Sequence, residues 1–326
     1  MGAMQKIRDV EEQTTKITEE MFAFAGYDAQ AAERTGYSNY SYWASTWRVF
    51  MKNRVAMFFL TLLLILMAFT FIQPYLPNQK NPTEVYISEE TGKQDRNQPP
   101  SGEYWFGTNS IGQDLWSRIW SGTRTSLFIG LAVGLWDAFM GIVIGSLWGY
   151  VRKLDAVFTE VYNVVHNIPS SIILILASYL LRPSVGTIIF AMCLTGWLPT
   201  ARYIRNQIVI IRDREFNLAS RCLGTPTGRV ITKNLLPQVV SVIMMRVALS
   251  IPLAIGQEVF LTYIGLGLPI SVPSLGNLIN EGRIVMMSPS LRYQLIFPSI
   301  ILSLITISFY VMGNSFADAA DPRNHV

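Results

Sequence analysis

The chain has 326 residues, of which 50% are hydrophobic and only 15% are charged. A soluble domain normally carries about a quarter of its residues as Asp, Glu, Lys or Arg, so this composition excludes an ordinary soluble enzyme or binding domain. The net charge of +4 does not indicate nucleic-acid binding, because the basic residues stand at the ends of apolar segments. At such positions they set the orientation of a chain in a membrane.

Residues 1–37 are polar and are expected to form a cytoplasmic N-terminal segment. The first 50 residues lack the apolar core of a cleavable signal peptide, so the first apolar segment is expected to act as the targeting signal. Residues 38–54 place aromatic side chains beside Arg48, Lys52 and Arg54. This pattern predicts a helix lying in the membrane interface; the alternative is that the stretch is only the flank of the first span.

Long uncharged stretches follow, and three of them lie between Arg54 and Lys80, between Arg182 and Arg202, and between Arg292 and Asp318. Each can hold the roughly 20 apolar residues that cross a hydrocarbon core of about 30 Å. The pattern predicts an all-α integral membrane protein, because a spanning segment must satisfy its own backbone hydrogen bonds. Six spans are predicted near residues 55–76, 125–151, 157–181, 184–205, 236–258 and 293–316.

Basic residues gather in two of the connections between these spans. They are Arg152 and Lys153 after the second span, then Arg202, Arg205, Arg212, Arg214, Arg221, Arg229 and Lys233 after the fourth. The loop 77–122 is richer in acidic residues. Because basic loops stay cytoplasmic, both termini, including the tail 317–326, are predicted inside. Loops 77–122 and 259–292 are predicted outside.

The second basic connection, Glu215–Pro237, contains a predicted short helix that ends at Gly224, a natural helix stop. Pro226 prevents immediate continuation, and an amphipathic run through Val230 leads into the next span. Such a projecting helix can insert into a groove of a partner protein. The alternative is an ordinary surface helix of a cytoplasmic loop.

This segment resembles the "EAA" loop of bacterial ABC importer permeases, through Ala219-Ser220-Arg221-Cys222-Leu223-Gly224 with Ile231 and Leu236-Pro237 downstream. The Glu of that pattern falls at Leu218, and its second Ala is Ser220. In that family the loop forms a coupling helix, here near 213–226, that seats in an ATP-hydrolysing subunit. The resemblance assigns docking to Glu215, Leu218, Ala219, Ser220, Arg221, Leu223, Gly224 and Pro226. Leu218 carries no charge, so no salt bridge is expected from that position.

Further blocks are similar to C-type permeases of oligopeptide systems, including the Ami-type systems of Gram-positive bacteria. They are Trp105–Thr108, Gly112–Arg118, Glu258–Gly267, Pro273–Gly276, Glu281–Arg283 and Asp321–Arg323. The resemblance implies the type I ABC importer permease fold over a core of residues 123–316. It also implies a bacterial cell membrane, and an oligopeptide cargo; alternatives are dipeptides or nickel complexes. The implied partners are a second homologous permease, two ABC ATPases holding ATP and Mg, an extracellular peptide-binding lipoprotein and membrane lipids.

Two charges lie inside predicted spans, Asp137 in the second and Arg246 in the fifth. A charge at that depth costs about 2.5–3.5 kcal/mol on insertion scales and should face the bundle interior or water. We expect Asp137 and Arg246 either to pair or to line a translocation path, where Arg246 could meet a peptide carboxylate. Glu258 is assigned to the same path.

Five glycines of the second span recur at three-, four- and seven-residue spacings, which favours close approach of helices; they are Gly130, Gly134, Gly141, Gly145 and Gly149. Two histidines, His166 and His325, make a histidine-rich metal site implausible. No GxxxxGK[ST] phosphate loop occurs, so we expect a transport subunit without an ATPase site. An intramembrane enzyme is a rival interpretation, but the sequence shows no catalytic constellation. A stand-alone ion-coupled carrier is another, but the sequence shows no clear repeated halves.

Overall fold

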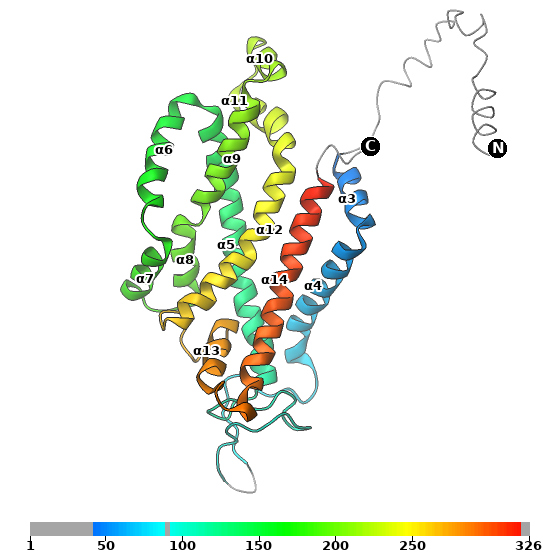
Figure 1. The fold of residues 1–326 in the computed structure, drawn as a ribbon, viewed down its shortest axis with the longest axis vertical. Coiled ribbons are helices and arrows are strands. Elements are labelled where there is room, and N and C mark those ends of the chain that lie inside the picture. The colour runs from blue at the N-terminus through cyan, green and yellow to red at the C-terminus, as the bar shows by residue number, and fades with distance from the viewer. Residues whose placement is uncertain (1–41, 89–91, 321–326) are drawn as a thin grey trace, which may run out of the picture. The chain divides into compact units, whose positions relative to one another are not determined.

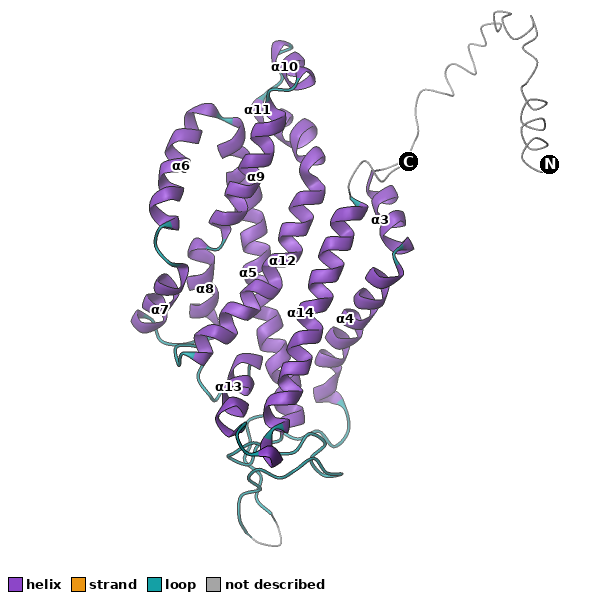
Figure 2. Cartoon of the chain, in the orientation of Figure 1, coloured by secondary structure: helices purple, strands orange, loops and turns teal. Residues whose placement is uncertain are grey.

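The computed structural model describes residues 42–88 and 92–320, and in them the chain is helical. Figure 2 shows helices joined by loops, and the only strand-like pairings among these residues are two isolated bridges, Ile87 with Gln94 and Thr108 with Asp114. The all-α prediction is confirmed. The helices are α3 (Tyr42–Lys52), α4 (Arg54–Ile72), η2 (Gln73–Tyr75), α5 (Leu115–Tyr150), α6 (Arg152–His166), α7 (Ser170–Leu180), α8 (Val185–Thr195), α9 (Trp197–Arg212), α10 (Glu215–Cys222), α11 (Thr227–Arg229), η3 (Val230–Leu235), α12 (Leu236–Tyr263), α13 (Leu275–Val285), η4 (Pro289–Leu291) and α14 (Tyr293–Ala319).

Five helical segments in the described part of the chain are long and apolar enough to cross a membrane. They are Arg54–Tyr75, Leu115–Tyr150, Val185–Arg212, Thr227–Tyr263 and Tyr293–Ala319. Five of the six predicted spans are therefore found, several of them longer than expected. The second begins at Leu115, so the preceding loop ends near residue 114 and not at 122. Asp114 starts that helix early, because its carboxylate accepts the Ser117 N–H at 2.9 Å as an N-cap.

The predicted third span, 157–181, is not one helix. It consists of α6 and α7, which meet at an angle of 71°, and only when this pair is counted as one span does the number rise to six. The cause lies at Pro169, which has no N–H to donate and disfavours a helical residue before it. Pro252 and Pro298 lie inside the unbroken helices α12 and α14, so of these prolines only Pro169 coincides with a break.

The long helix α5 packs closely on α9 and α12 through its glycines. A Cβ at Gly141 would lie 2.5 Å from Thr200 Cγ2, and one at Gly145 would lie 2.5 Å from the Ala201 carbonyl oxygen. Gly130 and Gly134 approach α12 in the same way, at Ile255 and Ile251. The predicted close approach of helices is confirmed, because an added Cβ at each of these positions would require the facing side chain or backbone to shift.

On the other side, α4 and α14 pack against α5 and α12 around a buried apolar cluster that includes Leu63, Ile119 and Ile305. The helix α3 places the buried Phe50 against Phe316 of α14, with ring centroids 5.5 Å apart. It is shorter than the predicted 38–54, because Asn53 ends it and caps α4; residues 38–41 lie outside the described part.

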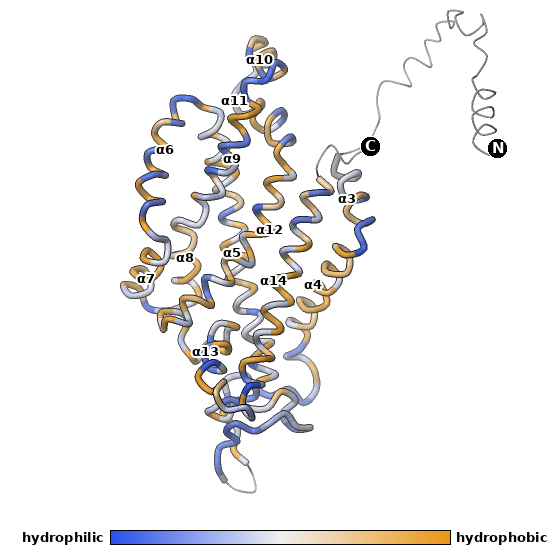
Figure 3. Tube along the Cα trace, in the orientation of Figure 1, coloured by the Kyte–Doolittle hydropathy of each residue, from blue (hydrophilic) through white to orange (hydrophobic). Residues whose placement is uncertain are grey.

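Different segments of the chain lie at the two ends of the helix bundle. Figure 1 places α10 at one end and the described parts of the loop, residues 76–88 and 92–114, with α13 at the opposite end. Figure 3 shows apolar residues along the middle of the helices and hydrophilic residues gathered at these ends. The helix α13 was not predicted; it begins at Ser274, whose hydroxyl accepts the Asn277 N–H at 3.0 Å. Both ends hold the segments that resemble family motifs.

The loop end is fastened by buried polar contacts. The fully buried Arg118 of α5 forms an ion pair with Glu281 of α13 at 2.7 Å and also hydrogen-bonds Gln113. Asn109 donates to the same Glu281 carboxylate at 3.1 Å. Gln294 of α14 donates to Asn97 at 2.8 Å. The loop, α13, α5 and α14 therefore form one connected structure at this end.

Candidate functional site

The helix α10 is an eight-residue helix set apart from the bundle, in the region predicted for docking. Glu215 lies in its first turn and Arg221 in its last, which is the favourable order for the helix dipole. It ends as predicted at Gly224, which has a φ of +74°. The Thr225 N–H donates to the Ser220 carbonyl at 3.1 Å and the Gly224 N–H to the Arg221 carbonyl at 2.9 Å. These two bonds form a Schellman C-cap, which needs the left-handed glycine.

Most of the residues assigned to docking are exposed. Leu218 and Leu223 are 45% and 86% exposed, and the neighbouring Phe216 is 43% exposed. Ser220 and Arg221 face the bundle and are half-buried. The remaining four, Glu215, Ala219, Gly224 and Pro226, are also exposed. An apolar tip on a projecting helix suits insertion into a protein groove.

Asn217 attaches α10 to the bundle, and the sequence prediction missed it. It is fully buried, and its amide donates to the Ile211 carbonyl at the end of α9 at 2.8 Å. The Asn234 amide donates to the Asn217 side-chain oxygen at 3.3 Å and to Ser220 Oγ at 3.0 Å. The available signal was an asparagine inside a short helix, where it is unfavourable unless its side chain bonds elsewhere. The helix is thus held to α9 and to η3.

Asp213 connects α10 to α9 and to the turn between α5 and α6. Its carboxylate lies 3.0 Å from Arg221, 3.2 Å from Arg152 and 3.3 Å from Arg212. The hydrogen bond from Arg221, followed by those from Arg212 and Arg152, lowers the pKa of Asp213. Arg212 also donates to the Gly149 carbonyl of α5 at 2.7 Å. A displacement of α10 would therefore be transmitted through these contacts to both α9 and α5.

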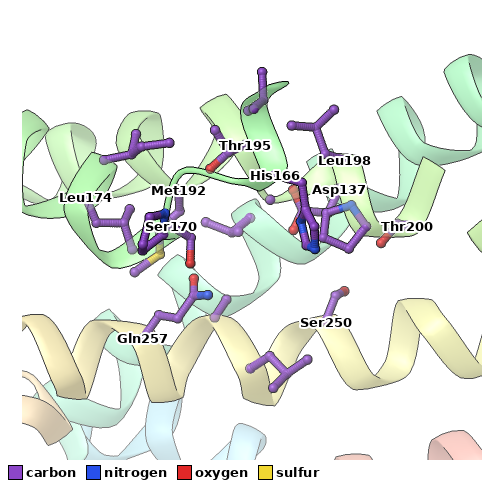
Figure 4. Close-up of a pocket in the computed structure, with 18 of the residues that line it drawn as sticks. Asp137, His166, Ser170, Leu174, Met192, Thr195, Leu198, Thr200, Ser250 and Gln257 are labelled. Atoms are coloured by element: carbon purple, nitrogen blue, oxygen red, sulfur yellow. The ribbon is translucent and has the colours of Figure 1, made fainter. Parts of the chain in front are cut away.

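A cavity of about 380 Å³ lies inside the bundle, away from α10. It is bordered by α5, the break between α6 and α7, the junction of α8 with α9, and α12, and Figure 4 shows Asp137 and His166 among its lining side chains. Asp137 and Arg246 both line it. His166 also stacks on Tyr162, with ring centroids 4.7 Å apart.

Asp137 and Arg246 form no ion pair with each other among the described residues. Arg246 instead lies over the Tyr203 ring, 4.2 Å from its centroid. Of the two expected arrangements, pairing is absent and the lining of a common cavity is present. A membrane path through that cavity remains a prediction.

Glu258 does not line the cavity, which differs from its assignment to the path. Its side chain is fully buried between α5, α12 and the start of α13. The carboxylate accepts hydrogen bonds from Ser126 at 3.1 Å and Thr262 at 3.2 Å. Gly276 approaches so closely that a Cβ there would lie 2.7 Å from Glu258 Oε1. Spacing along the sequence could not reveal that three segments converge on Glu258, and its assignment to the path remains a prediction.

Comparisons with known proteins match the chain along nearly its whole length. Residues 141–326 match the family model described as "Binding-protein-dependent transport system inner membrane component". Residues 41–100 match the "N-terminal TM domain of oligopeptide transport permease C". The matched ranges include α4, α10 and α14.

Individual relatives agree with these family matches. The oligopeptide transport system permease protein AmiD of Streptococcus pneumoniae is 38% identical over 95% of this chain and 99% of its own. The dipeptide transport system permease protein DppC of Bacillus subtilis is 34% identical, covering 96% and 95%. The oligopeptide transport system permease protein OppC of Bacillus subtilis is 31% identical, covering 94% and 98%. The chain therefore belongs to the family of binding-protein-dependent transport system inner membrane components, with the type I ABC importer permease fold and the N-terminal membrane domain of the oligopeptide permease C type.

Proposed function

We propose that this chain is a permease subunit of an ATP-driven importer of oligopeptides in a bacterial cell membrane. The observation that carries the proposal is α10, a capped helix with an exposed apolar tip that projects from a bundle of spans. A carrier working alone has no use for such a tip. Oligopeptide cargo is supported by the names of two of the relatives, in Streptococcus pneumoniae and Bacillus subtilis.

In this proposal two ATPase subunits hold ATP and Mg, and the present chain has no ATPase site. The α10 tip, with Phe216, Leu218 and Leu223, seats in a groove of one ATPase. Closure of the ATPases moves α10, and the movement reaches α9 and α5 through Asp213 and its arginines. Buried contacts at Asn217 keep α10 from moving independently of α9.

The membrane orientation follows from the basic residues around α10. Arg212, Arg214, Arg221, Arg229 and Lys233 support a cytoplasmic location for that end and for both termini. The loop 76–114 and α13 then face outward, where they would receive the extracellular peptide-binding lipoprotein. A second homologous permease completes the path for the peptide.

The chain offers a matched pair of glycines that tests the coupling role. Gly224 has φ +74° and Gly228 does not have a positive φ, yet nothing lies within 4 Å of a Cβ at either. A Cβ therefore fits at both positions, but at Gly224 a residue with a side chain meets a backbone penalty of about 1–2 kcal/mol. In vesicles with the complete importer, Gly224→Val should abolish ATP-driven peptide uptake, while Gly228→Val should retain it. The affinity of the binding lipoprotein for peptide should be unchanged in both.

Purification of the tagged chain from its native host in mild detergent checks the partners. Recovery of a second permease and two ATPases supports the proposal. Recovery of this chain alone, under conditions that preserve known complexes, would favour a stand-alone carrier and leave α10 without a function.

A dipeptide importer is the second candidate, because the Bacillus subtilis dipeptide permease is 34% identical over 96% of this chain. The two cargo classes are separated by competition in the same uptake assay. Displacement of labelled tetra-alanine by excess unlabelled tetra-alanine, but not by dialanine, supports oligopeptides. Uptake of labelled dialanine that is displaced by excess unlabelled dialanine, but not by tetra-alanine, supports dipeptides.

A further inference from the structure

Asp137 is a carboxylate without a partner, placed where an unpaired charge is costly. Its residue is only 7% exposed, and its Oδ1 atom is buried without a hydrogen bond. A buried charge is normally paired or faces water or a ligand inside the membrane. Among the described residues that line the cavity, Asp137 is the only acidic one. The described helices therefore leave the Asp137 carboxylate available to accept hydrogen bonds from a molecule inside the cavity.

The position of the carboxylate is built by the surrounding helices. A Cβ at Gly196 would lie 2.7 Å from one Asp137 oxygen and 2.8 Å from the other. Gly196 is the residue between α8 and α9, so the missing side chain makes room for the carboxylate at the first turn of α9. The Asp137 carboxylate therefore occupies a space left by the absent side chain of Gly196.

Arg246, the cation of the same cavity, is held away from Asp137. Its guanidinium lies over Tyr203, and its Nε atom has no hydrogen-bond partner. The cavity lining also offers hydroxyl oxygens such as that of Ser250, which donates its proton to the Val247 carbonyl at 2.8 Å. Much of the remaining lining is apolar, including Val133, Leu174 and Leu253.

We propose that this cavity is a subsite for the ammonium group of a peptide, with Asp137 as the group that binds it. An ammonium group donates up to three hydrogen bonds, which a carboxylate and hydroxyl oxygens can accept. A metal ion is less suited, because the described residues contain no group of three His, Cys, Asp or Glu side chains that could hold one. The exposed break at Ile168–Ser170 borders the cavity and offers the way in. This inference rests on the proposed peptide-import function.

The test measures equilibrium binding of labelled peptides to the importer of two permeases and two ATPases in lipid nanodiscs, without the binding lipoprotein. The probes are trialanine and N-acetyl-trialanine, which differ in the ammonium group. Asp137→Asn should weaken trialanine binding about tenfold or more, as expected for loss of a charged hydrogen bond. Binding of the acetylated peptide should not change. Gly196→Ala, which displaces the carboxylate without removing it, should weaken trialanine binding by a smaller factor.

The control variant is Glu160→Gln, which removes a carboxylate from an exposed position on α6 outside the cavity; it should bind both peptides like the wild type. A third probe, N-acetyl-Ala-Ala-Lys, separates the sources of the ammonium group. Binding as tight as that of trialanine assigns the subsite to any peptide ammonium, and weaker binding assigns it to the α-ammonium.

Three results would overturn the inference: no binding of trialanine by the wild type, unchanged binding by Asp137→Asn, or an equal loss for both peptides. The last would indicate a packing defect. The proposed function is checked separately, by ATP-driven uptake in vesicles with the wild-type importer and its binding lipoprotein. If that uptake is present while Asp137→Asn binds normally, the subsite is wrong and the import function stands.

Discussion

The loop end and the α6–α7 arm both border α5, but they are held in different ways. The loop end, residues 76–114 with α13, has the fully buried Arg118 in its ion pair and the buried Tyr104. The arm has few buried residues, Tyr162 in α6 and Leu174 and Ser178 in α7. Its ion pair, Arg205 with Asp155, is about one-quarter exposed on each side.

This difference indicates which part can move. Segments with few buried contacts open at low free energy, whereas buried polar networks stay closed. Apolar side chains of the arm such as Val157 and Val164, 59% and 60% exposed, are available to lipid or to a second permease. We infer that the loop end is the fixed part and the arm the movable part of this subunit.

The largest expected effect comes from removing the arginine that pairs with a carboxylate of each region, Glu281 of the loop end and Asp155 of the arm. Arg118→Ala should lower the free energy of unfolding by about 3–5 kcal/mol, because it leaves Glu281 without its buried partner. Arg205→Ala should lower it by about 1 kcal/mol, since its pair is partly in water. Thermal unfolding in detergent measures both. Equal losses would contradict a distinction between a fixed end and a movable arm.

An intermediate effect is expected where α5 packs on α9. Gly145→Ala should cost about 1–3 kcal/mol, because the added Cβ would lie 2.5 Å from the Ala201 carbonyl oxygen. Gly186→Ala in α8 is the matched control, as its nearest neighbour would be 3.9 Å away; alanine there should be neutral or slightly stabilising. The same unfolding assay applies. A stable Gly145→Ala variant would show that the α5–α9 contact is adaptable.

Features fixed by local sequence were predictable. Five of the six spans follow from uncharged apolar stretches, and the end of α10 follows from Gly224, because a positive φ at a helix end is a local property. Contacts between distant residues were not predictable. Arg118 and Glu281 are 163 positions apart, and Glu258 is enclosed by residues of three segments.

In the candidate site, too, features set by the local sequence could be predicted and features set by distant contacts could not. The exposure of Leu223 follows from its place beside the helix stop, whereas the fastening role of Asn217 depends on the distant Asn234. The cavity depends on the 71° break between α6 and α7. Pro169 marks the place of that break, but the angle and the space behind it depend on the packing of the neighbouring helices.

The smallest expected effect is the pH dependence of the exposed ionic contacts at the α10 end. The pKa of Asp213 is lowered in the folded chain by its arginines, so the unfolded chain takes up its proton first. Its contribution is therefore present above about pH 4 and is lost as the pH falls further. Because the group is exposed, the difference in unfolding free energy between wild type and Asp213→Asn should stay below about 1 kcal/mol. A difference that grew on acidification would have the wrong sign.

The division of the third span has a consequence for the biogenesis of the protein. The helix α7 has 11 residues, about 16 Å at 1.5 Å per residue, which is roughly half of the hydrocarbon thickness. The helix α6 has 15 residues and carries Arg152, Lys153, Asp155 and Glu160, so neither half is an independent membrane-insertion signal. We expect the spans on either side to help retain the arm in the bilayer during synthesis, so that completion of α8 and α9 commits this part of the chain to the membrane.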